Sequence, residues 1–141
     1  MPLYKKVIKK LLNKNITISI AESCTGGQLS SKFTSEAGIS KIFNMGLITY
    51  SNNAKSNLLK ISHNQIKKYG AVSDKTAMLM VKNLQNLSKS QLCISITGIA
   101  GPSGGTKTKP VGLIFFGIYF KKKITVFQKK FNGTRSQIQN K

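Results

Sequence analysis

The stretch ITISIAESCTGG, residues 16–27, decides the fold of this chain. Its first half is rich in isoleucine, as a buried strand is, and the pair Gly26 and Gly27 permits a tight turn into a helix. A strand-to-helix turn lifts a side chain above the edge of a sheet and directs backbone N–H groups toward whatever binds there. Two hydroxyls, a thiol and a carboxylate lie at this turn, so the sequence predicts a nucleophile here.

The rest of the chain alternates helices with strands, which predicts an α/β fold: a three-layer α/β/α sandwich with a mixed sheet. No linker divides residues 1–141, so we expect a single domain, and the few residues after Arg135 predict a truncated C-terminal helix. The loop 98–110 is long and rich in glycine, which is typical of functional loops. Periodicity predicts helices at 3–13, 26–36, 52–59, 63–69 and 74–88, and strands at 16–22, 46–50, 91–97, 111–120 and 124–131.

Composition narrows the classes of function. No apolar run has the length of a membrane span, and two cysteines make no disulfide framework, so we expect a cytoplasmic protein that does not enter membranes. The helix at 3–13 is basic and amphipathic, and we expect it to pack on the domain. The net charge of +20 favours non-specific adhesion to nucleic acid at low salt. However, the lysines are scattered, and Arg135 is the only arginine of the sequence, whereas phosphate and base readers favour arginine.

A serine nucleophile needs a group that takes its proton. His63 lies in a polar helix start, and three acidic residues leave little material for a Ser-His-Asp triad. A lysine is the remaining base, because burial near other cations lowers its pKa. Tyr50 ends one strand and Lys55 lies about one turn into the next helix, so both can point back toward Ser23. The sequence therefore predicts Ser23 as nucleophile and Lys55 as base, with Tyr50 relaying the proton or stabilising the amine.

Four segments together resemble one known family. They are AESCTGG at 21–27, ITYSNNAK at 48–55, YGAVSD at 69–74, and SITGIAGPSGG at 95–105 with KPVG at 109–112. Over nearly the whole chain, about Thr17 to Arg135, the sequence is similar to the CinA C-terminal domain family, the nicotinamide-nucleotide amidohydrolases. The resemblance implies hydrolysis of the carboxamide of nicotinamide mononucleotide to nicotinate mononucleotide and ammonia, with neither metal nor cofactor. It places the family's serine, tyrosine and lysine on Ser23, Tyr50 and Lys55, and it implies a homodimer or a larger self-assembly.

Substrate contacts are expected from the segments that follow the strands. Backbone N–H groups of the turn 25–27 or near Gly46 are candidates for binding an oxyanion. The glycine-rich loop, the helix start at Gly26 and a bidentate Arg135 are candidates for the phosphate. The expected substrate-binding residues are Glu22, Thr25, Gly26, Gly27, Gly46, Ser51, Asn52, Thr97, Gly98, Gly101, Gly104 and Arg135.

Several alternatives stay open at the level of sequence. Glu22 either holds Lys55 or a substrate hydroxyl, or caps the turn, and Cys24 is either a buried filler or a nucleophile. Arg135 is either a phosphate ligand or a solvated cation, and Thr134 stands where the family has an aspartate. For the whole chain, the alternatives to an amidase are a non-catalytic nucleotide-binding or regulatory remnant of the family and a basic nucleic-acid-binding module.

Overall fold

The computed structural model describes residues 1–140 and has one five-stranded mixed sheet, in the order β2-β1-β3-β4-β5. The central strand β1 runs parallel to β2 and β3, whereas β4 runs antiparallel to β3 and β5. This arrangement brings the carboxyl ends of β1, β2 and β3 to the same edge of the sheet. The strands are β1 (Ile18–Glu22), β2 (Phe43–Ile48), β3 (Leu92–Gly98), β4 (Leu113–Phe120) and β5 (Lys123–Lys130).

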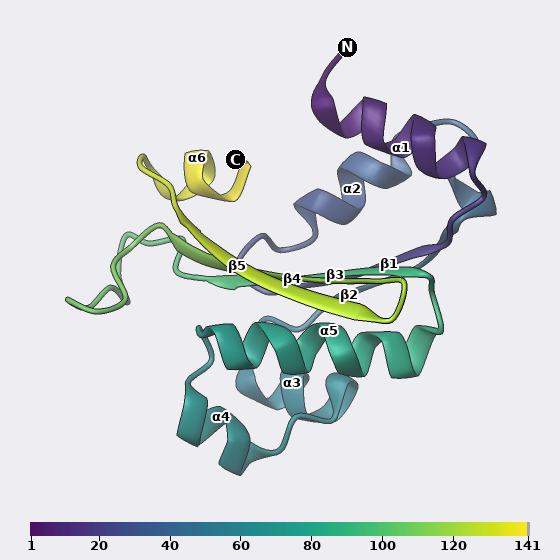
Figure 1. Cartoon of the computed structure of the whole chain (residues 1–141). Coiled ribbons are helices and arrows are strands. Elements are labelled where there is room, and N and C mark those ends of the chain that lie inside the picture. The colour runs from purple at the N-terminus through teal and green to yellow at the C-terminus, as the bar shows by residue number, and fades with distance from the viewer. Residues whose placement is uncertain (141) are drawn as a thin grey trace.

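Helices cover the sheet from both sides, so the predicted three-layer α/β/α sandwich is confirmed (Figure 1). One outer layer holds α1 (Leu3–Asn13), α2 (Gln28–Thr34) and the short α6 (Arg135–Asn140). The other holds α3 (Asn52–Leu59), α4 (His63–Tyr69) and α5 (Asp74–Ser88), with α5 directly beneath the strands.

The bounds of helices α1, α3, α4 and α5 match the prediction, whereas those of all five strands and of α2 differ by a few residues. Strand β2 begins at Phe43 rather than at residue 46, since the Phe43 ring packs near that of Phe33 (6.5 Å between centroids) and Asn44 donates a side-chain hydrogen bond to Ser90 (2.7 Å). Helix α2 begins at Gln28, after two glycines with positive φ, and the sequence did not predict the 3₁₀ helix Ile39–Lys41.

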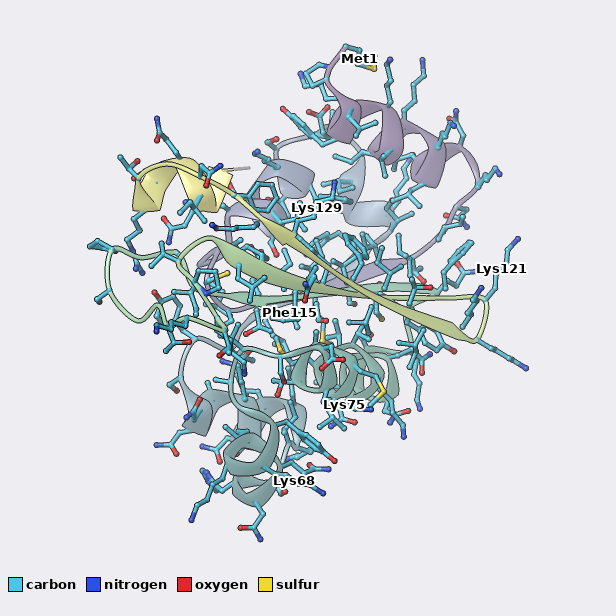
Figure 2. The ribbon with its side chains drawn as sticks, turned by 60° about the vertical axis from the view of Figure 1, so that its left-hand side comes forward. Met1, Lys68, Lys75, Phe115, Lys121 and Lys129 are labelled. Carbon is cyan, nitrogen blue, oxygen red and sulfur yellow. The ribbon has the colours of Figure 1, made fainter. Side chains whose placement is uncertain are left out.

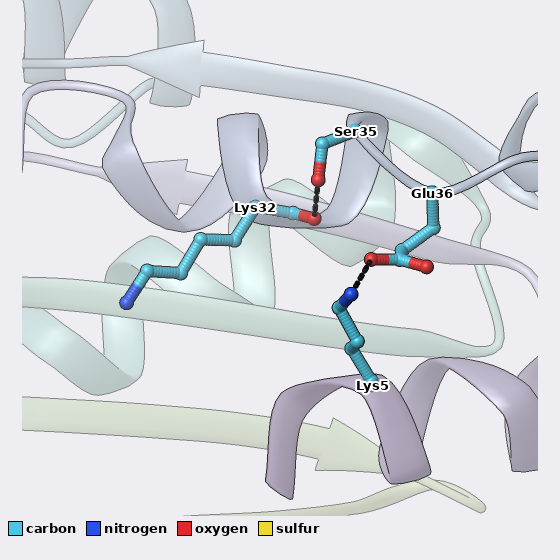
Figure 3. Close-up of polar contacts among 4 residues, drawn as sticks. All are labelled: Lys5, Lys32, Ser35 and Glu36. Carbon is cyan, nitrogen blue, oxygen red and sulfur yellow. Dashed lines mark hydrogen bonds and ion pairs between the residues drawn. The ribbon is translucent and has the colours of Figure 1, made fainter. Parts of the chain in front are cut away.

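The core lies on both faces of the central strand, and every residue of β1 is buried. Ile18 and Ile20 pack with α1 and α2, and Ala21 packs with α5. The basic helix α1 buries Ile8 and Leu11 against this core, as the sequence predicts. An ion pair of 3.7 Å between Lys5 and Glu36 links α1 to the segment after α2 (Figure 3). Among the described residues, 1–140, no helix is long and apolar enough to cross a membrane.

Helix α5 packs close against β4 at a glycine of that strand. A Cβ atom added at Gly117 would lie 2.5 Å from Ser95 Oγ and 2.8 Å from the carbonyl oxygen of Ala77. It would also break the 2.7 Å hydrogen bond by which Ser95 holds that carbonyl. We therefore expect Gly117→Ala to lower the free energy of unfolding by about 1–3 kcal/mol. Urea denaturation measures this change, and an unaltered midpoint would contradict the close packing.

Candidate active site

Three separate segments meet at the carboxyl edge of the parallel strands, around a cleft of about 230 Å³. The turn after β1, the segment after β2 and the end of β3 with its following loop form most of its walls, as expected for an open α/β sheet. Ala71 and Val72 before α5 and Arg135 of α6 complete the lining. Of the residues predicted from sequence, those that line the cleft are Ser23, Tyr50, Lys55, Thr97, Gly98, Gly101 and Arg135.

The centre of this cleft is a hydroxyl paired with an amine. Lys55 Nζ lies 3.0 Å from Ser23 Oγ, within hydrogen-bonding distance. Both side chains are buried, with 1% of Lys55 and 6% of Ser23 exposed. Lys55 reaches this position from the first turn of α3, whose N-cap is Ser51, so the chain path after β2 directs the side chain toward the turn after β1.

Backbone carbonyls hold the amine from the other side. Nζ donates to the carbonyl oxygens of Thr49 (3.0 Å) and Tyr50 (3.4 Å). A neutral amine has two N–H bonds and one lone pair. If the two carbonyls accept the two N–H bonds, the lone pair is left facing Ser23 Oγ, which is the arrangement that a general base requires.

Burial also favours the neutral form of this amine. Desolvation lowers the pKa of Lys55 below its ordinary value of 10.5, and only a weaker interaction with Cys24 raises it. No carboxylate makes an ion pair with Lys55 among the described residues, so no fixed negative charge restores the ammonium. The environment therefore shifts the lysine toward the protonation state that accepts a proton.

This lowered pKa predicts the pH dependence of any reaction at Ser23. We expect kcat/KM to rise with pH as Lys55 loses its proton, with a midpoint below 10.5. The free energy of unfolding should also rise with pH. The unfolded chain binds the Lys55 proton more tightly than the folded chain does, so stability increases between the lowered pKa and 10.5. A pH–rate profile measures the midpoint, and a rate independent of pH in this range would contradict a lysine base.

The Tyr50 hydroxyl does not lie between Ser23 and Lys55. It accepts a hydrogen bond from Arg135 Nη2, and the Tyr50 side chain is about half exposed at the mouth of the cleft. Arg135 also donates through Nη1 to the carbonyl oxygen of Gly101. Tyr50 therefore contacts the lysine through its backbone, and its phenol and Arg135 together span the cleft mouth. The expected proton relay through the phenol is not present in this arrangement.

The Glu22 carboxylate makes its hydrogen bonds outside the cleft. Its Oε1 accepts from Thr25 Oγ1 (2.6 Å) and from the backbone N–H of Leu29 (3.0 Å), and its Oε2 accepts from the N–H of Ser30 (2.8 Å). Of the two readings left open by the sequence, the structure supports the cap. Glu22 contacts neither Lys55 nor the cleft, which corrects its assignment to substrate binding. Because the carboxylate already occupies the start of α2, the predicted phosphate site there is also wrong.

Two N–H groups near Ser23 Oγ are already used within the protein. The N–H of Ser23 donates to the carbonyl of Ile96 (3.0 Å), and the N–H of Gly26 donates to the carbonyl of Ser23 (3.1 Å). Neither is available to an oxyanion. Gly26 and Gly27 instead provide the positive φ angles, +62° and +100°, that the turn requires.

Other predicted substrate contacts have structural roles. Gly46 lies in the middle of β2, paired with Ile20, where an added Cβ would meet Ser30 Oγ at 2.7 Å. It is therefore a packing position and not an oxyanion donor. Ser51 caps α3 by accepting from the N–H of Ala54 (3.0 Å).

Of the remaining predicted contacts, one lines the cleft and three lie outside its lining. Thr97 lines the cleft, but its hydroxyl donates to the carbonyl of Ala71 (2.7 Å). Asn52 and Gly104 are exposed and lie outside the lining, and Thr25 lies on the wall of a neighbouring apolar pocket.

Cys24 is buried next to Ser23 and packs with Ile96, Ala100, Ile114 and Ile138. Desolvation raises the pKa of its thiol to about 11, so the thiol stays protonated at neutral pH. A thiolate is the nucleophilic form of cysteine. The environment thus favours the hydroxyl of Ser23, and Cys24 fills space.

Sequence reasoning missed part of the lining. Ala71, Val72, Ile99, Ala100 and Ser103 all face the cleft. Ala71 and Val72 belong to the segment YGAVSD, which leads into α5, and the other three lie in the loop after β3. Four of these side chains are apolar and Ser103 is one of many serines, so only their place within the quoted segments pointed to the site.

The fold and the buried Ser23–Lys55 pair together define an α/β/α protein with the site at the carboxyl edge of its parallel strands. A family model described as the CinA C-terminal domain matches residues 1–141. The chain belongs to the CinA C-terminal domain family.

Individual relatives agree with this assignment. The chain is 48% identical over 134 residues to a CinA-like protein of Prochlorococcus marinus, covering 94% of the chain and 32% of that protein. It is 44% identical over 138 residues to a CinA-like protein of Kosmotoga olearia, covering 97% and 34%. The chain thus spans about a third of the length of these relatives. A solved structure, the competence/damage inducible protein CihA from Agrobacterium tumefaciens, superposes with a TM-score of 0.92 at 31% identity, covering 96% of this chain and 84% of that one.

Proposed function

We propose that this chain hydrolyses the carboxamide of nicotinamide mononucleotide to nicotinate mononucleotide and ammonia, with Ser23 as the nucleophile and Lys55 as the base. The observation that supports the proposal most directly is the 3.0 Å contact between Ser23 Oγ and Lys55 Nζ. This amine is buried, and burial lowers its pKa. Membership of the CinA family makes this substrate plausible.

The proposed reaction has two halves. In the first, Ser23 Oγ bonds to the carboxamide carbon while Lys55 takes the hydroxyl proton. The C–N bond then breaks, and Lys55 gives that proton to the leaving nitrogen, which departs as ammonia. In the second half, water attacks the ester, Lys55 takes a proton from the water and returns it to Ser23, and nicotinate mononucleotide leaves.

The cleft suits an anionic substrate. Arg135 lies at its mouth, and its lining contains Lys55 but no aspartate or glutamate among the described residues. A substrate phosphate would compete with the Tyr50 hydroxyl and the Gly101 carbonyl for the guanidinium of Arg135, because Arg135 donates a hydrogen bond to each of them. Arg135 is therefore the proposed phosphate ligand.

The experiment that tests this function is incubation of the purified chain with nicotinamide mononucleotide. We expect ammonia and nicotinate mononucleotide in equal amounts, measured by coupled ammonia assay and by chromatography. Nicotinamide riboside, which lacks the phosphate, should react more slowly. A properly folded chain that releases no ammonia would instead support the non-catalytic nucleotide-binding alternative.

The charge of the chain favours a second, weaker candidate, a nucleic-acid-binding module. The net charge is +20, and the lysines are scattered along the whole sequence. Lys68, Lys75, Lys121 and Lys129 extend from different parts of the molecule (Figure 2). The test is whether the chain binds a nucleic-acid duplex with an affinity that falls steeply with salt. If this binding survives mutation of Ser23 and Lys55, it is non-specific adhesion that does not involve the cleft.

A further inference from the structure

The buried carboxylate of Glu22 takes no part in the proposed reaction, although Glu22 directly precedes Ser23. Its side chain is 0% exposed in a chain with three acidic residues. A carboxylate removed from water requires hydrogen-bond donors. The donors here are Thr25 Oγ1 and the backbone N–H groups of Leu29 and Ser30, which lie on the far side of the nucleophile turn.

These contacts replace a helix cap that the local sequence does not provide. Helix α2 begins after Gly27, which has no side chain to accept from the first N–H groups of the helix. Glu22 accepts from the second and third of these groups from its position in β1. Backbone hydrogen bonds hold part of the turn 23–27, from Gly26 N–H to the carbonyl of Ser23 (3.1 Å) and from Gln28 N–H to that of Thr25 (3.1 Å). Glycine restricts the backbone least, so the carboxylate adds the side-chain bonds that tie this turn to the start of α2.

The backbone of Glu22 is connected to the other half of the pair. Its carbonyl accepts from the N–H of Thr49 (2.8 Å), and the carbonyl of Thr49 accepts from Lys55 Nζ (3.0 Å). Glu22 is thus bonded to the turn that carries the nucleophile and to the residue that holds the base. A movement at this position would change the distance between Ser23 and Lys55.

We propose that Glu22 is a positioning residue: its carboxylate locks the turn 23–27 onto the start of α2 and so keeps Ser23 Oγ within reach of Lys55 Nζ. The inference deepens the proposed amidase function and rests on it. Since Glu22 does not line the cleft, its removal should change the chemical step rather than substrate binding.

The test replaces Glu22 with glutamine, which has nearly the same shape but sets an NH₂ group against one of the three donors. Two rates are measured: hydrolysis of nicotinamide mononucleotide, and labelling of Ser23 by a small alkyl fluorophosphonate. In labelling, a bond forms between Ser23 Oγ and phosphorus, fluoride leaves, and Lys55 takes the hydroxyl proton. For Glu22→Gln we expect kcat and the labelling rate to fall at least tenfold, with KM changed less than twofold.

Two further variants make the test specific. Thr25→Val removes one of the three donors and should lower the labelling rate, whereas Thr25→Ser keeps the hydroxyl and should restore it. Glu36→Gln removes the other glutamate, which pairs with Lys5 away from the cleft, and should leave both rates unchanged. If Glu22→Gln does not fold, as circular dichroism would show, Thr25→Val decides the question because it retains the carboxylate.

The outcomes separate this inference from the proposed function. Unchanged kcat and labelling in Glu22→Gln and Thr25→Val would overturn the positioning role, and so would a raised KM at unchanged kcat, which indicates substrate binding. A wild-type chain that is labelled at Ser23 but releases no ammonia refutes the substrate, while the labelling rates still test Glu22. A wild-type Ser23 that takes no label overturns both.

Discussion

Replacing Lys55 with methionine is expected to lower kcat by about 10²–10⁴-fold, the usual contribution of a general base. Methionine keeps the length and the apolar stem of the side chain but has no proton acceptor near Ser23 Oγ. The loss should not be recovered at high pH, because the group that titrates is gone. Steady-state hydrolysis of nicotinamide mononucleotide between neutral and alkaline pH measures both effects.

The same variant separates catalysis from stability. Methionine leaves the carbonyls of Thr49 and Tyr50 without their donor, at about 1–3 kcal/mol for an unsatisfied buried group. It also removes an amine whose charged form is penalised by burial, which offsets part of that loss. We therefore expect a modest change in thermal stability beside a large loss of activity.

A matched control is Lys82→Met, at an exposed lysine of α5, which should leave kcat unaltered. If Lys55→Met retained more than a tenth of the wild-type kcat, Lys55 would not be the base, and the contact with Ser23 would be structural.

The sequence was sufficient for the layers of the fold and for the approach of Lys55 to Ser23. Both residues lie just beyond adjacent parallel strands, and a lysine one turn into a helix has the length to reach back. The direction of the Tyr50 hydroxyl could not be predicted in this way. It depends on Arg135, which is 85 residues distant in sequence and is placed by the path of the chain after β5.

The role of Glu22 also depended on three-dimensional information. Its identity as a carboxylate beside a nucleophile is equally compatible with substrate binding and with capping. Only the position of Leu29 and Ser30 at the start of α2, seven and eight residues later, identifies its partners. Gly46 shows the same limit, because a glycine near a predicted strand end resembles an oxyanion donor until its close packing with Ser30 is seen.

Replacing Ser23 with alanine is expected to reduce kcat by at least about 10³-fold, because no acyl-enzyme can form, and only binding and electrostatic effects remain. Alanine fits the same buried position, so the fold should be retained. Ammonia release under substrate saturation measures the loss, and mass spectrometry after a short reaction with wild type would detect the acyl group on the peptide that contains Ser23.

The neighbouring thiol provides the comparison that makes this result specific. Cys24→Ala should keep kcat within about threefold, since burial raises the pKa of the Cys24 thiol to about 11 and leaves almost no thiolate at neutral pH. Because Cys24 packs in an apolar cluster, this variant should lose stability instead, by about 1 kcal/mol. The reverse pattern, an active Ser23→Ala and an inactive but folded Cys24→Ala, would move the nucleophile from the hydroxyl to the thiol.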